Sequence, residues 1–159
     1  MTKNGLSYDK KAFKDIADMM AEKVKRLEEA IEFNVIYHIG PDVTTHAKTY
    51  KTFKDQTSNL VSSIGFVLAK NGEVISMGGF EAKGGPNGDG SEGVKKGKEY
   101  AEELARSVGK GYVLIVVAGM NYASYVEAKS YNVLTASGTY LESEVNKMID
   151  RILKKAGFK

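Results

Sequence analysis

The sequence predicts a single α+β domain with a long N-terminal helix and a small, mostly antiparallel sheet of three to four strands, packed by a middle and a C-terminal helix. Three observations support this fold class: a long helical stripe of apolar residues, two β-like runs joined by Asn-Gly, and one unbroken apolar run later in the chain. A length of 159 residues gives room for one ordinary domain, so residues 1–159 are treated as one unit.

The first element is a helix predicted over residues 7–39. Its apolar residues recur at steps of three and four, the spacing of one helix face: Phe13, Ile16, Met20, Val24, Leu27, Ile31 and Val35. Gly40 followed by Pro41 predicts the helix end, because glycine commonly follows the last turn and proline cannot continue it. At 1.5 Å per residue the helix would be about 45 to 50 Å long, which is longer than a domain of this size is usually wide, so we expect part of it to project. Its apolar stripe is expected to pack against either the sheet of this domain or another subunit.

A short helix and a hairpin are predicted next. Residues 57–64 have the pattern of a short helix, which Asp55 or Thr57 would open. Two β-like runs, 66–70 and 73–77, then flank an Asn-Gly dipeptide, which favours the type I′ turn of a tight hairpin.

Residues 78–93 are rich in glycine, and this composition predicts a mobile loop that does not pack. Two ligand motifs fail here. A phosphate-binding Walker loop needs a hydroxyl residue where Glu99 stands, and a calcium loop counted from Asn87 needs Gly and Glu where Glu92 and Lys98 stand. The loop is therefore interpreted as solvated, with ordering on a partner left as the alternative.

A middle helix and a strand follow the loop. Residues 94–108 predict a helix with Tyr100, Leu104 and Val108 on one side. Residues 112–118 form an apolar run that predicts a strand covered on both faces, and we expect it to be the central strand of the sheet.

The last third of the chain predicts a helical turn over 122–128, a fourth, edge strand over 131–135, and a closing helix over 139–156. Thr139 and Glu142 have the spacing of a capping box at the start of that helix.

Composition narrows the classes of function. The chain has no cysteine, which excludes disulfides, thiolate nucleophiles, Cys-ligated zinc and iron–sulfur clusters. The formal charge of +3 is too small to indicate by itself that the protein binds nucleic acid. The start of the chain lacks the apolar core of a signal peptide, and no apolar run approaches the roughly 18 residues of a membrane span, so secretion and membrane insertion are disfavoured.

Residue patterns of catalysis or metal binding are missing from the sequence. His38 and His46 have no ligand at helical spacing, and we interpret both as surface or capping residues. No G-x-S-x-G elbow occurs and the carboxylates are scattered, so no catalytic, cofactor-binding or metal-binding residue is nominated. Glu127 stands out only because it follows Tyr122 and Tyr125, a residue type that favours interfaces.

A segment of alternating cations and aromatic rings spans residues 48–54. Lys48, Lys51 and Lys54 could contact phosphates while the neighbouring rings stack on bases. The same residues also suit a loop or an edge strand that lysine protects against edge pairing. Both interpretations remain open at this point.

Two motifs resemble a known family. The first is T-x-x-L-x-x-S-I at Thr57, Leu60, Ser63 and Ile64; the second is G-x-x-Y-A-x-Y-V-E at Gly119, Tyr122, Ala123, Tyr125, Val126 and Glu127. Both, in the same order of elements, are found in the tail-completion or head–tail joining proteins, also called minor tail or neck proteins, of tailed double-stranded-DNA bacteriophages. The resemblance covers roughly residues 55–156.

The resemblance implies a non-enzymatic structural virion protein, a homo-oligomeric ring of commonly six copies that joins the tail tube to the head–tail connector. It implies location in the tail or neck of the virion, in the host cytoplasm during assembly, with DNA passing non-specifically through the lumen and with no cofactor and no membrane. The candidate interface residues are Ile16, Met20, Val24, Leu27, Tyr122, Tyr125 and Glu127. The alternatives are a small nucleic-acid-binding module using residues 48–54 and a small hydrolase with an unrecognised site.

Overall fold

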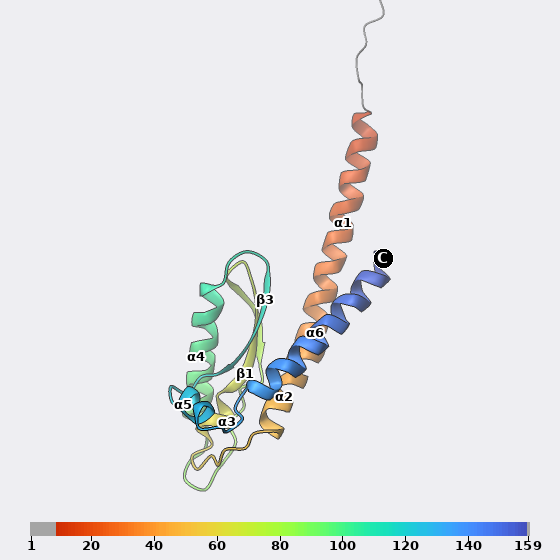
Figure 1. Ribbon diagram of the computed structural model, residues 1–159. Helices are drawn as coiled ribbons and strands as arrows, with labels where there is room; N and C mark the ends of the chain where they lie inside the picture. Colours follow the sequence, from red (N-terminus) through yellow and green to blue (C-terminus); the bar gives the residue numbers. More distant parts are fainter. Residues whose placement is uncertain (1–8, 159) are drawn as a thin grey trace, which may run out of the picture.

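The computed structural model describes residues 9–158 and confirms the predicted α+β class (Figure 1). The elements follow the chain in the order α1 (Lys10–Asn34), η1 (Val35–Ile39), α2 (Gly40–Thr49), α3 (Asn59–Ser62), β1 (Ile64–Lys70), β2 (Glu73–Gly78), α4 (Ser91–Ser107), β3 (Tyr112–Ala118), α5 (Ala123–Ala128) and α6 (Thr135–Lys155). In the part of the chain that the structure describes, no helix combines the length and apolar character of a membrane span.

The long helix does not end at Gly40 and Pro41, so that prediction was wrong. α1 continues through η1, a π-helical turn in which the Gly40 amide donates to the Val35 carbonyl, into α2. The wider turn lies just before Pro41, the point where a regular helix would lose a hydrogen bond. Gly40 serves close packing instead: a Cβ there would lie 2.5 Å from the Phe66 ring. The predicted first two residues, 7–8, lie outside the described residues.

The sheet has three strands in the order β2-β1-β3, all antiparallel. The predicted hairpin is confirmed, with Asn71 and Gly72 both at positive φ. β1, not β3, is the central strand, because it pairs with both neighbours. Its alternate side chains are buried on opposite faces: Val67 packs on α4, and Leu68 packs on α1 and α6.

α4 covers one face of the sheet, and the long helix with α6 covers the other (Figure 1). The fully buried stripe of α4 consists of small residues four apart, Gly93, Gly97, Ala101 and Ala105. Leu104 and Val108 of the predicted face are partly buried and pack against the same cluster. Tyr100 of that expected face is 42% exposed. The small residues let α4 approach the sheet and α3 closely.

Two predictions for the last third of the chain were wrong. Residues 131–134 form no strand, and α6 begins at Thr135, four residues before the expected capping box at Thr139 and Glu142. The first turn of α6 is capped by a side chain from the preceding helix, as described below. The helical turn expected at 122–128 is confirmed as α5.

The glycine-rich segment between β2 and α4 packs in part, through Gly85, Gly88 and Gly90, although most of residues 81–89 are exposed as a solvated loop would be. Its glycines lie so close to residues 56–62 that a Cβ at Gly85 or Gly90 would lie 2.3 Å from a serine oxygen. The Lys83 amide donates to Ser62 Oγ at 3.1 Å, and the Asn87 amide donates to the Gln56 carbonyl at 3.0 Å. The mobility of the segment stays a prediction.

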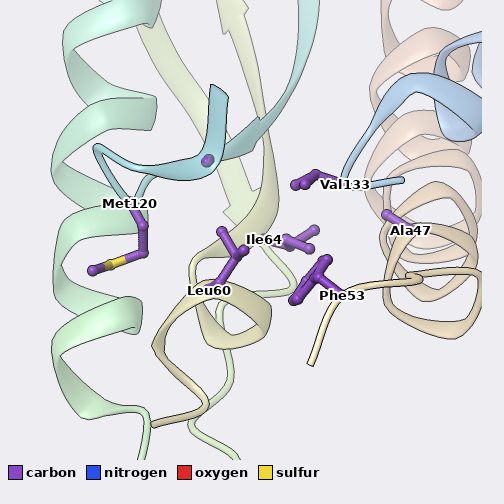
Figure 2. Close-up of a cluster of buried hydrophobic side chains, with 7 residues drawn as sticks. Ala47, Phe53, Leu60, Ile64, Met120 and Val133 are labelled. Atoms are coloured by element: carbon purple, nitrogen blue, oxygen red, sulfur yellow. The ribbon is translucent and has the colours of Figure 1, made fainter. Parts of the chain in front are cut away.

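Below the sheet, a cluster of buried apolar side chains joins two stretches of the chain that are distant in sequence, 47–64 and 120–133 (Figure 2). Its labelled members are Ala47, Phe53, Leu60, Ile64, Met120 and Val133. The cluster fixes the segments on either side of α5 and the segment after α2, which carries Lys51 and Lys54.

Candidate functional site

The N-terminal half of α1 projects away from the rest of the molecule (Figure 1). Phe13, Ile16, Met20 and Val24, here called the projecting stripe, are 53% to 67% exposed. Leu27, the next residue of the stripe, is instead partly buried against α6. Three of the four α1 residues nominated as interface are therefore available to a partner, and the fourth belongs to the core.

The two nominated tyrosines lie on α5 and at its start. Tyr125 is 60% exposed, with Lys129 Nζ 4.6 Å from its ring centroid. Tyr122 is 38% exposed, and partial burial, followed by the charge of Asp55, raises its pKa. Both rings are thus partly open to solvent.

Glu127 is engaged within the chain. Its carboxylate accepts hydrogen bonds from the backbone amides of Val133, Leu134 and Thr135 at 3.0 to 3.1 Å, and from the Thr135 hydroxyl. Partial burial alone would raise the pKa of Glu127, but these four donors outweigh it and lower the pKa below its ordinary value. The side chain therefore caps α6, with its oxygens turned inward.

We expect Glu127→Gln to lower the free energy of unfolding by about 1 to 3 kcal/mol at neutral pH, because the neutral amide accepts fewer and weaker bonds. A depressed pKa in the folded state means that the stabilisation is complete above the ordinary value near 4.5 and is lost as the pH falls through the folded-state pKa. Urea unfolding of both proteins between pH 7 and pH 3 measures this.

Glu142→Gln is the matched control, since Glu142 is an exposed glutamate of α6, the helix that Glu127 caps. It should change stability little at any pH. A difference between wild type and Glu127→Gln that stays constant down to pH 3 would contradict the assigned role.

The nominated lysines do not act as one patch. Lys48 lies in α2, where its ammonium donates to the Gly79 carbonyl and burial lowers its pKa, against an opposing effect of Glu81. Lys51 and Lys54 follow α2; Lys51 is half-buried and Lys54 is exposed. Phe53, the ring between them, is 6% exposed and belongs to the core, so it is not available for stacking.

Asn132 fastens the segment after α2 to the segment after α5. Its backbone amide donates to Thr52 Oγ1 at 2.7 Å, and its side-chain amide donates to the Tyr50 carbonyl at 2.8 Å. Two open hollows of about 460 and 680 Å³ share Thr52 and Tyr131 as lining residues. The structure therefore joins two segments singled out independently into one surface, here called the Lys–Tyr surface: Tyr50, Lys51, Lys54, Tyr125, Lys129 and Tyr131.

The two histidines differ in environment. His38 is exposed, whereas the half-buried His46 stacks on Tyr140 with ring centroids 4.5 Å apart and places Nδ1 2.9 Å from Ser137 Oγ. His46 thereby ties α2 to the first turn of α6. Within residues 9–158, no group of three or more histidine, aspartate or glutamate side chains gathers in a way that could hold a metal ion.

Comparison with known proteins finds no matching family model, no similar curated protein and no similar solved structure.

Proposed function

We propose that this chain is a structural virion protein, a ring-forming tail-completion or neck subunit that joins the tail tube of a phage to the head–tail connector and has no catalytic role. The proposal rests on the motif resemblance and on one structural observation, the projecting stripe. Three of its apolar side chains, Ile16, Met20 and Val24, lie on one face of the projecting helix and are more than half exposed among residues 9–158. Such a patch marks an interaction site.

Identical copies that meet through two different surfaces assemble head to tail, and the assembly closes as a ring when the rotation between copies allows it. A projecting helix suits such contacts because it reaches beyond its own domain. Burying an exposed apolar side chain stabilises an interface by about 1.5 to 3 kcal/mol, so the stripe offers enough for assembly when several copies act together.

The test is the oligomeric state of purified protein, measured by light scattering after size exclusion and by negative-stain imaging, alone and with tail-tube and connector proteins. We expect a discrete oligomer. In Ile16→Gln/Met20→Gln, loss of about 3 kcal/mol per interface should weaken association roughly 100-fold. Because both side chains are exposed, the thermal midpoint of the isolated domain should not change.

Lys11→Gln/Asp18→Gln is the matched control. It places two glutamines on the opposite side of the same helical segment and, like the test variant, leaves the net charge unchanged. It should assemble as wild type does. A strictly monomeric wild type under both conditions, or equal assembly of the two variants, would refute the proposal.

A further inference from the structure

We propose that the Lys–Tyr surface is a binding site for single-stranded nucleic acid. This inference is independent of ring formation, because it rests on other residues. The surface forms where segments about 75 residues apart meet, and neither segment carries the full set of groups alone: Lys54 lines one hollow together with Tyr125, Lys129 and Tyr131. Lys51 lies beside this hollow, with Nζ 5.0 Å from the ring centroid of Phe53, which lines it.

The backbone beneath this surface is held firmly. In addition to the two Asn132 bonds, the Thr52 amide donates to the Asn132 carbonyl at 3.4 Å. Phe53 points into the buried cluster below and anchors the strip that carries Lys51 and Lys54 (Figure 2). The side chains above are thus displayed on a fixed base, which reduces the ordering cost of binding.

The three lysines retain their capacity for an anionic partner. Within residues 9–158, none of them forms an ion pair. Lys51 donates to the Phe53 carbonyl at 3.4 Å and lies over the Phe53 ring, and Lys129 lies over the Tyr125 ring. The neighbouring carboxylates are already used: Asp55 accepts from the Val61 amide at 2.7 Å, and Glu127 caps α6. Both carboxylates keep their negative charge but bind backbone amides, so neither is paired with one of the three lysines in the described residues.

The tyrosines identify the class of anion. Tyr50, Tyr125 and Tyr131 are 60%, 60% and 47% exposed around the two hollows, so part of each ring is open to a planar group. Cations that follow a phosphate chain beside rings that stack on bases are the combination by which proteins hold single strands. Duplex bases are stacked on one another and would leave these rings without a role, which favours the single strand.

The test is fluorescence anisotropy of a labelled oligothymidylate of about 15 nucleotides with the full-length protein, over a range of salt concentrations. Three phosphate contacts predict a slope near −2 in log affinity against log salt. Lys51→Gln/Lys54→Gln/Lys129→Gln should abolish most of that slope. Tyr125→Ala/Tyr131→Ala should weaken binding at least tenfold while the slope is retained.

The matched control is Lys23→Gln/Arg151→Gln/Lys155→Gln, which removes the same number of positive charges from the groove between α1 and α6. Both triple variants lower the formal charge from +3 to zero. The control should bind as wild type does. An equal loss in the control, equally tight binding of a duplex of the same length, or no binding at low salt would each overturn the proposal.

Light scattering of the same preparations separates this inference from the proposed function. The lysine triple and the tyrosine double are expected to assemble as wild type does, and their far-UV circular dichroism should report an unchanged fold. Binding that persists in a strictly monomeric wild type would support this site and refute the ring.

Discussion

Gly119→Ala is expected to lower the free energy of unfolding by about 3 kcal/mol, because a Cβ at that position has no room. Gly119 follows β3 directly, where its amide donates to the Ser63 carbonyl at 3.2 Å. An added Cβ would lie 2.4 Å from the Gly97 Cα and 2.7 Å from the Lys96 carbonyl oxygen. Both are backbone atoms of α4, so a rotamer change cannot relieve the contact and the helix itself must move.

The same substitution at Gly138 supplies the control. Gly138 lies in α6 with nothing within 4 Å of its Cβ position, so alanine there only raises helix propensity. Gly138→Ala should stabilise the protein by about 0.5 to 1 kcal/mol. Urea unfolding at neutral pH compares the two variants. If the free energy of unfolding of Gly119→Ala lies within about 0.5 kcal/mol of the wild-type value, then α4 does not lie as close to the end of β3 as described.

The periodic elements could be predicted from the sequence because their signals are local. A stripe at steps of three and four specifies the long helix, and Asn-Gly between two β-like runs specifies the hairpin. A glycine in the sequence is ambiguous, because glycine occurs both where a helix ends and where two segments pack closely together. At Gly40 the second use applies, and only the position of Phe66, distant in sequence, reveals it.

The same ambiguity explains the glycine-rich segment and the small-residue stripe of α4. The glycine content of this segment predicts a flexible backbone. In the structure, Gly85 and Gly90 instead lack a side chain where the segment packs closely against residues 56–62. β3 was expected at the centre because its apolar run is the longest. Its place at the edge depends on pairing order, which hydrophobicity does not encode.

The candidate surfaces were predicted in part. Periodicity located the projecting stripe, although it could not show that Leu27 turns into the core. Lys51 and Lys54 were found from local alternation of cations and rings, but Lys129 and Tyr131 were missed. Their place beside the lysines depends on the hydrogen bonds of Asn132, a residue with no distinctive local pattern.

Phe53→Ala is expected to lower the free energy of unfolding by about 3 to 5 kcal/mol, the cost of deleting a buried aromatic ring and leaving a cavity. The ring is 6% exposed and packs in the cluster with Leu60, Ile64 and Val133. The sequence placed it among cations as a stacking candidate, and a stacking ring on the surface would cost little to remove. Stability therefore distinguishes the two roles.

Tyr125→Ala is the comparison, because that ring is 60% exposed and its loss should change stability by no more than about 0.5 kcal/mol. Phe53→Leu, which keeps most of the buried volume, should recover the greater part of the loss. Thermal and urea unfolding of the three variants provide the measurement. Equal stability of Phe53→Ala and Tyr125→Ala would mean that Phe53 is not in the core. The Lys–Tyr surface would then lack the anchor that holds Lys51 and Lys54 in place, because the ring beneath them is what fixes that strip of chain.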